Sequence, residues 1–201
     1  MISRRKNRRS LSACADMLWT GGENLKVWAA QTPVEALAGA DYVVTTLRVG
    51  GDHSRVLDEK IALKHGVIGQ ETTGVGGFSM AVRTIPVLLD YCRMIKEYAP
   101  NAWIFNFTNP SGLVTQALRS AGYDRVIGIC DAPSSTKFRM AACLGTEEDD
   151  LYVEFFGLNH LSWIRSVKKE GKRSFHSFWR MTIFLGKSRN LPCLIRNCCV
   201  P

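Results

Sequence analysis

The sequence predicts an α/β protein built on a partial, doubly wound parallel sheet. Four short segments rich in apolar and β-branched residues, at 41–47, 102–107, 125–129 and 151–156, have the length and composition of buried strands. Segments with helical spacing separate them, and alternating strands and helices are typical of parallel sheets. The chain has 201 residues, 46% of them hydrophobic, which is enough for one domain with a sizeable core, or for one domain plus a small appendage.

Start and stop signals define the elements in order. Residues 1–32 have weak periodicity, and TGGEN at 20–24 predicts a turn. Thr32, followed by Pro33 and Glu35, is typical of a helix N-terminus. From there the predicted elements are a helix at 33–39, a strand at 41–47, a helix at 53–66, a glycine-rich loop at 69–77, a helix at 78–98, a strand at 102–107, a helix at 110–120, a strand at 125–129, a helix that ends near 144 and a strand at 151–156.

The positive charge of the chain is confined to its two ends. The net charge is +8, but residues 1–10 alone hold five basic and no acidic side chains, and residues 168–201 hold eight basic side chains and one acidic. The rest of the chain is therefore mildly acidic. Nucleic-acid binding needs a basic face on the folded domain, and basic runs at termini are usually solvated. We expect no nucleic-acid partner.

Composition also argues against a membrane or secreted protein. No apolar run approaches the roughly 18 to 20 residues that a membrane helix needs, and no apolar stretch of signal-peptide type follows the basic start. The seven cysteines are odd in number and irregularly spaced, which does not indicate a disulfide framework. We therefore expect a cytoplasmic protein with mostly inert thiols.

Polar side chains follow three of the predicted strands at the point where each strand ends. They are Asn106 and Asn109 after the second strand, Cys130 and Asp131 after the third, and Asn159 and His160 after the fourth. In open parallel sheets, ligands bind at the carboxyl ends of the strands. The sequence therefore predicts a functional site at this edge of the sheet.

Cys130 and His160 are the two residues of this set best suited to a metal. Thiolate and imidazole are good ligands for divalent transition metals, although two ligands do not complete a site. The alternative is a buried core cysteine and a hydrogen-bonded histidine. Asp131 has the properties of a helix N-cap, and the same carboxylate could serve as a general acid or base because an N-cap faces the ligand crevice.

Three further features are candidates for ligand contact. Asn109 is a plausible N-cap ahead of Pro110, at a helix N-terminus suited to anions or hydroxyls. Arg55 follows Gly50-Gly51 in an expected crevice loop, where the alternative is an arginine in solvent. The segment Gly69–Gly77 is dense enough in glycine to let backbone approach a ligand closely.

Four ordered motifs between about residues 33 and 169 resemble glycoside hydrolase family 4. They are RVGGDHSRVLDEKIALKHGVIGQETTGVGG, NAWIFNFTNPSGLVTQAL, VIGICDAP and FFGLNHLSW. The ETTG and GLNHLSW forms are most similar to the 6-phospho-β-glucosidases. The resemblance implies a Rossmann-like sheet and the start of a second, α+β domain. We expect a weakly defined segment at 1–32, part of an NAD-binding domain at 33–157, and the start of the catalytic domain with a divergent tail at 158–201.

The resemblance also implies an activity that differs from the common two-carboxylate route. The family uses NAD and a divalent metal, usually manganese, to oxidise the sugar at C3, remove the C2 proton and eliminate the group at C1. By motif, Cys130 and His160 are metal ligands, Asp131 is the acid, and Arg55 and Asn109 contact the substrate. No NAD-contacting residue is singled out. The expected substrate is a phosphorylated glucoside or disaccharide, and the intact family enzyme is expected to be a homo-oligomer.

Two departures from the family pattern point to a fragment. No glycine-rich dinucleotide turn precedes residue 40, and after about Lys172 the sequence changes character. We therefore expect a truncated chain whose isolated activity is doubtful. Two alternatives remain open. One is a dehydrogenase-like protein that acts on 2-hydroxy acids with NAD, and the other is a non-catalytic fragment that associates through exposed apolar surface.

Overall fold

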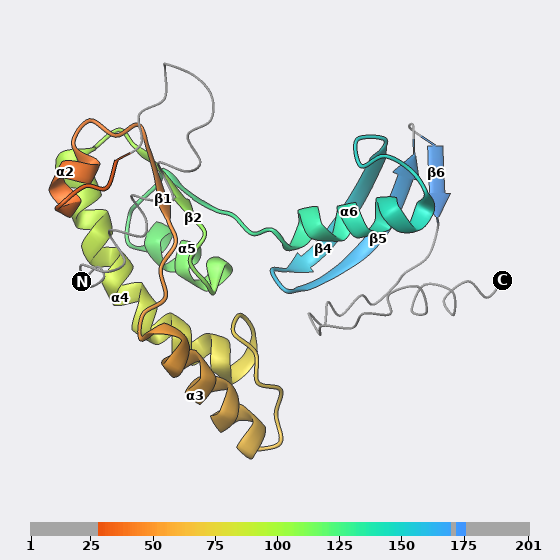
Figure 1. Ribbon diagram of the computed structural model, residues 1–201, viewed down its shortest axis with the longest axis horizontal. Helices are drawn as coiled ribbons and strands as arrows, with labels where there is room; N and C mark the ends of the chain where they lie inside the picture. Colours follow the sequence, from red (N-terminus) through yellow and green to blue (C-terminus); the bar gives the residue numbers. More distant parts are fainter. Residues whose placement is uncertain (1–27, 170–171, 176–201) are drawn as a thin grey trace.

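The computed structural model describes residues 28–169 and 172–175 of the chain (Figure 1). The elements, in chain order, are α2 (Pro33–Leu37), β1 (Tyr42–Thr45), α3 (Gly51–Lys64), α4 (Gly74–Tyr98), β2 (Trp103–Asn106), α5 (Ser111–Ser120), β3 (Val126–Gly128), α6 (Ala132–Leu144), β4 (Leu151–Leu158), β5 (Leu161–Lys169) and β6 (Lys172–Phe175). The turn predicted at 20–24 and the tail beyond 175 lie outside the described residues.

The first part of the chain forms the predicted parallel sheet, in the order β1-β2-β3. In register, Val43 lies beside Ile104, and Ile104 beside Val126. This row faces the main core, which α4 and α5 complete with residues such as Leu88 and Leu118. The α/β fold class is therefore confirmed, and the carboxyl ends of the three strands meet at one edge, as predicted.

The opposite face of the same sheet is apolar and exposed. Tyr42 pairs in register with Trp103, and Val44 lies on the row that leads through Phe105 to Ile127. The exposed fractions of Tyr42, Val44, Trp103 and Ile127 lie between 39% and 69%. Parallel sheets are normally covered on both faces. Among the described residues, the main core cluster covers one of the two faces.

The predicted fourth strand does not join the parallel sheet, and that expectation is wrong. β4 continues to Leu158, turns through the two-residue loop Asn159-His160 and pairs with β5 in an antiparallel hairpin that β6 extends. A partner two residues away is reached at little entropic cost, so the local hairpin forms. α6 packs on this second sheet around Ala141 and Leu151 (Figure 1). The expected domain division at 157/158 stays a prediction, although β4 extends across it.

The glycine-rich segment Gly69–Gly77 was expected to be a loop, but its second half is the first turn of α4. Its contact with a ligand stays a prediction. A Cβ on Gly76 would lie 2.4 Å from the carbonyl oxygen of Gln70, and one on Gly77 would lie 2.3 Å from that of Thr72. A Cβ on Gly69 would likewise lie 2.5 Å from the carbonyl oxygen of Glu59. These glycines therefore allow backbone to pack on backbone.

Two helix starts differ from prediction in ways that matter for the site. α3 begins at Gly51, two residues before the predicted start at 53, and Arg55 lies within this helix and not in the crevice loop that was also expected there. α5 begins at Ser111 with Pro110 at the N-cap position, so Asn109 precedes the helix and does not cap it. The capping predicted at Thr32 is confirmed, because its hydroxyl accepts a hydrogen bond from the Glu35 amide at 3.2 Å.

The longest helix of the described residues is not a membrane helix. α4 has 25 residues, but its C-terminal half carries several charged side chains and its buried face packs in the core. In the part of the chain that the structure describes, no helix combines the length and the apolarity needed to cross a bilayer.

Candidate active site

Cys130 and His160 come together from different parts of the fold. Cys130 follows β3, where the Ile129 amide donates a hydrogen bond of 2.9 Å to the carbonyl of Asn106 and so holds the chain to β2. His160 is the second residue of the β4–β5 loop. The Cys130 Sγ and His160 Nε2 atoms are 3.3 Å apart, and neither residue is buried in the core.

His160 has a backbone conformation that is uncommon for histidine. Its φ is +59°, in the left-handed region that glycine favours. Such strain persists where the surrounding structure determines it, and it clusters at functional sites. The hairpin therefore orients the imidazole toward the thiol at a local conformational cost.

The separation of the pair fits two ligands of one cation. With a metal–sulfur distance of about 2.3 Å, a metal–nitrogen distance of about 2.1 Å and an angle of about 90–110°, the two ligand atoms lie roughly 3.1–3.6 Å apart. Within the described residues, no group of three or more His, Cys, Asp or Glu side chains could hold a metal ion. Oxygens of substrate or water would have to complete the coordination.

Asp131 lies beside this pair with its carboxylate exposed. It occupies the N-cap position of α6, yet its side chain makes no capping hydrogen bond. The Cys130 thiol donates a long hydrogen bond of 3.9 Å to Asp131 Oδ1. The carboxylate is therefore free of the capping role that the sequence favoured, and it faces solvent next to the thiol.

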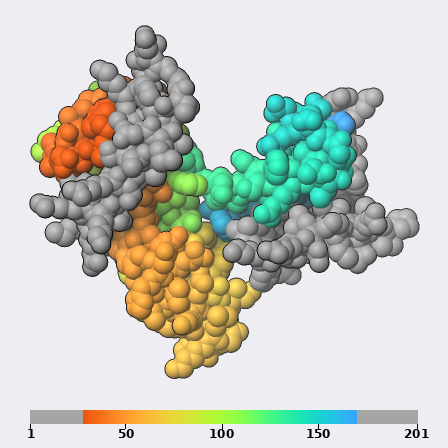
Figure 2. Space-filling view, in the orientation of Figure 1, coloured from red at the N-terminus to blue at the C-terminus, as the bar shows by residue number. Residues whose placement is uncertain are grey.

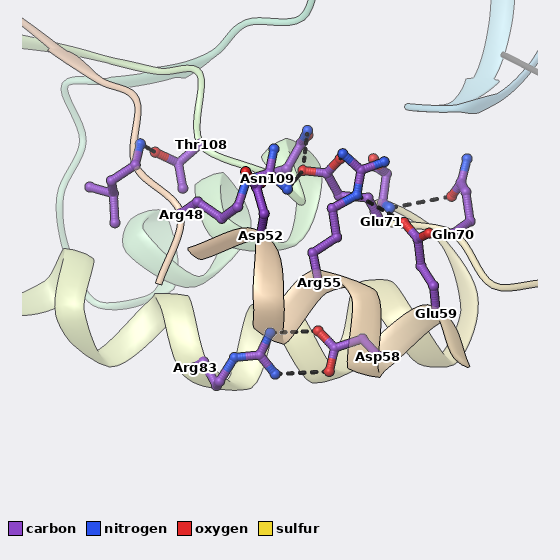
Figure 3. A network of polar contacts seen from close by, with 12 residues as sticks. Arg48, Asp52, Arg55, Asp58, Glu59, Gln70, Glu71, Arg83, Thr108 and Asn109 are labelled. Atoms are coloured by element: carbon purple, nitrogen blue, oxygen red, sulfur yellow. Dashed lines mark hydrogen bonds and ion pairs between the residues drawn. The ribbon is translucent and has the colours of Figure 1, made fainter. Parts of the chain in front are cut away.

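Arg55 and Asn109 meet at a third residue, Glu71 (Figure 3). The Arg55 Nη1 and Glu71 Oε2 atoms are 3.1 Å apart, and Asn109 Nδ2 donates to Glu71 Oε1 at 3.4 Å. Arg55 also donates to Glu59 at 2.9 Å, and this hydrogen bond is the main cause that raises the pKa of the guanidinium. Arg55 is thus a paired arginine and not one left in solvent.

Arg48 and Glu71 are the site residues that sequence reasoning missed. Arg48 Nη1 lies 2.8 Å from Glu71 Oε1, and Arg48 also pairs with Asp52. The strand-end rule would have found Arg48, because it follows β1 as Asn109 follows β2. Glu71 carries no comparable signal, since it lies in the glycine-rich segment before α4.

A neighbouring ion pair fixes the helices that carry this network. Arg83 on α4 donates to both carboxylate oxygens of Asp58 on α3 (Figure 3). A two-point guanidinium–carboxylate contact has defined geometry. It therefore sets the position of Arg55, which lies one turn before Asp58.

The predicted site residues thus form two groups. Cys130, His160 and Asp131 form one, and Arg55 and Asn109 form the other. Among the described residues, no hydrogen bond or ion pair joins a side chain of one group directly to a side chain of the other. The groups are connected through the first residue of α5, because the Ser111 hydroxyl, two residues after Asn109, donates to the carbonyl of Ile129, which precedes Cys130, at 3.2 Å.

A cleft of about 650 Å³ adjoins the thiol–imidazole pair. It lies between α5, the end of β3 and the β4–β5 hairpin, and Thr115, Gln116, Phe156 and Asn159 contribute to its walls. The Asn159 Nδ2 atom is buried without a hydrogen-bond partner. The space-filling view shows the molecule hollowed between the part that contains α3–α5 and the part that contains α6 (Figure 2).

Comparison with known proteins identifies the class of this fold and site. The sequence profile of the family 4 glycosyl hydrolases matches residues 2–146. The chain is 44% identical over 164 residues to the 6-phospho-beta-glucosidase of Escherichia coli, covering 81% of this chain and 36% of that protein. It is 38% identical over 174 residues to the 6-phospho-alpha-glucosidase 1 of Lacticaseibacillus paracasei, covering 85% and 39%.

A solved structure gives the same result. The 6-phospho-beta glucosidase of Thermotoga maritima, determined with manganese, NAD+ and glucose-6-phosphate, superimposes with a TM-score of 0.70 at 40% identity. The match covers 75% of this chain and 37% of that one. This chain belongs to family 4 of the glycosyl hydrolases. It spans well under half the length of these relatives.

Proposed function

We propose that this chain carries part of the active site of a cytoplasmic glycosidase that acts on 6-phospho-glucosides, with NAD and a divalent metal such as Mn²⁺ as cofactors. The observation that carries the proposal is the 3.3 Å separation of Cys130 Sγ and His160 Nε2, beside the exposed carboxylate of Asp131. The relatives named above support the substrate class, and the ETTG and GLNHLSW motifs favour the β anomer.

Each proposed site residue has a role that its chemistry allows. Cys130 and His160 would hold the cation, which supplies Lewis-acid polarisation of sugar oxygens while NAD supplies reversible hydride transfer. Asp131 would donate a proton to the leaving-group oxygen. Arg55 and Asn109 would donate hydrogen bonds to substrate oxygens and so orient the sugar.

Metal binding by the full chain tests this proposal. We expect Mn²⁺ to raise the midpoint of thermal unfolding under reducing conditions, and Cys130→Ser to abolish that rise because a hydroxyl is a far weaker ligand than a thiolate. Cys143→Ser is the matched control, since Cys143 is an exposed free cysteine on α6. Equal responses of the two variants would overturn the metal assignment.

Turnover addresses the substrate class separately. Hydrolysis of an aryl 6-phospho-β-glucoside is compared with that of its α anomer and of the unphosphorylated glucoside, with NAD, Mn²⁺ and a reducing agent present. Because this chain carries only part of the active site, we expect little or no turnover of these substrates, and we expect any turnover to be confined to the phosphorylated β anomer. Hydrolysis of the unphosphorylated glucoside alone would exclude the proposed class.

A second candidate function is association through the exposed apolar face that Tyr42, Val44 and Trp103 form on the parallel sheet. The exposed Tyr42, Val44 and Trp103 side chains favour pairing with a second copy of this chain, because contiguous apolar surface marks interaction sites. Val44→Glu is expected to lower the mass measured by light scattering. Val82→Glu, on the exposed surface of α4, is the control. The same mass for both variants would exclude this face. No observation favours the dehydrogenase alternative.

A further inference from the structure

We infer that Asn106 is the positioning residue of this site, fixing Asn109 relative to Cys130; the inference rests on the proposed function. Asn106 is the last residue of β2 and is fully buried. A buried position in a parallel strand is ordinarily apolar, and a buried amide is costly unless it is hydrogen-bonded. The location of its partners therefore indicates what the amide is for.

The acceptor side of the amide joins β1 to the loop that carries Asn109. Oδ1 of Asn106 accepts from the Thr45 hydroxyl at 2.9 Å and from the Thr108 amide at 3.2 Å. Thr45 ends β1, three residues before Arg48. The Thr108 hydroxyl in turn accepts from the Leu47 amide at 3.2 Å. The segments that lead to Arg48 and to Asn109 are thereby tied together.

The donor side joins the same loop to α5. Nδ2 of Asn106 donates to the carbonyls of Thr108 and Ser111, at 3.3 and 3.4 Å, and to the Thr115 hydroxyl at 3.2 Å. The loop residue Asn109 therefore lies between two points that one side chain holds. The loop in this shape places the Asn109 side-chain amide 3.4 Å from Glu71 Oε1.

The backbone carbonyl of Asn106 holds the segment that leads to Cys130. It accepts a hydrogen bond from the Ile129 amide at 2.9 Å, and at 3.4 Å it shares the single Ser111 hydroxyl proton with the Ile129 carbonyl. Ile129 directly precedes Cys130. Packing here is close, because a Cβ on Gly128 would lie 2.5 Å from the Thr115 hydroxyl. Asn106 thus connects the ends of all three strands.

Asn106→Asp tests this inference because it keeps the size and the acceptors but removes the Nδ2 donors. The probe is Co²⁺, whose thiolate absorption band reports the environment of Cys130. We expect the absorption band to change and the Co²⁺ affinity to fall roughly tenfold, which is the size of effect seen when a residue that orients a metal ligand is removed. Hydrogen exchange should accelerate at 107–111 but not in α4.

Two further variants keep the test decisive. Leu88→Ala destabilises the core without touching this network, so it should leave the cobalt band unchanged at a temperature where the variant is folded. Thr45→Val removes a single hydrogen bond to Asn106 and covers the case in which Asn106→Asp does not fold. It should produce a smaller change of the same kind.

The outcomes separate this inference from the proposed function. The inference would be overturned if the cobalt band is unchanged in both Asn106→Asp and Thr45→Val, or if hydrogen exchange accelerates in α4 as much as at 107–111. Either result would show that Asn106 has only a structural role. Absence of the band in the unsubstituted chain would instead count against the proposed function. In that case the exchange comparison alone decides whether Asn106 orders the loop.

Discussion

Glu71 shares its carboxylate between two arginines and is largely buried, with its side chain 14% exposed. Glu71→Gln keeps the shape but leaves Arg48 and Arg55 without that charge. We expect a loss of about 1–2 kcal/mol in the free energy of unfolding, because solvent screens the partly exposed arginines. Urea denaturation measures it.

The control for this prediction is an ion pair in solvent. Asp90 and Arg93 on α4 form an ion pair with each other, and their side chains are 68% and 69% exposed. Asp90→Asn should change stability by less than about 0.5 kcal/mol. Equal losses for Glu71→Gln and Asp90→Asn would contradict the argument from burial.

Cys92 gives the protein a predictable dependence on alkaline pH. Burial raises the pKa of its thiol to about 11, whereas in the unfolded chain the pKa is about 8.5. Between these values the unfolded chain loses the proton first, so it binds fewer protons than the folded chain and stability falls as pH rises.

We expect this thiol to contribute a loss of about 2.5 kcal/mol between pH 8.5 and 11. The measurement compares denaturation of the unsubstituted chain and of Cys92→Ala at several pH values. The variant should be less stable at neutral pH, because it leaves a cavity, but its stability should fall less steeply. Parallel pH curves would refute the assignment to Cys92.

The site residues differ in how far the sequence could predict them. Cys130 and His160 follow strands, and the structure brings them to 3.3 Å, although their role as metal ligands stays a prediction. Glu71 was missed because its importance arises from two arginines on separate elements. Such a network exists only after folding, so no local pattern indicates it.

At the scale of elements, α5 shows how strongly burial determines the effect of a substitution. Leu118 is 0% exposed in the main core, whereas Leu113 on the same helix is 48% exposed. Leu118→Ala should cost about 2–5 kcal/mol, because it removes buried methyl groups and leaves a cavity. Leu113→Ala should cost less than about 1 kcal/mol. Similar costs in thermal or urea unfolding would show that α5 is placed wrongly.

Helix and strand positions were largely predictable, but the role of the glycines was not. Apolar periodicity placed the body of α4 correctly, while its start lies four residues before the expected position at 78. Gly76 and Gly77 lie in the first turn of α4, where the carbonyls of Gln70 and Thr72 leave no room for a side chain. That constraint comes from chain folded back on itself, which a linear pattern does not contain.

For the whole molecule, alternation of strands and helices predicted the parallel sheet but assigned it one strand too many. The segment at 151–156 has the apolar composition of a buried strand. Composition does not determine which partner a strand takes. The neighbouring β5 offers a nearer partner than the parallel sheet does, so a second sheet forms.

Because Cys130 follows one sheet and His160 belongs to the other, a cation held by both would act as a reversible cross-link between them. It would close a loop of about thirty residues, much as a disulfide does, and so restrict the unfolded chain. A chelator should then lower the resistance of the α6 segment to proteolysis as well as the unfolding midpoint. The affinity for the ion would measure, in part, the free energy of bringing the two sheets together.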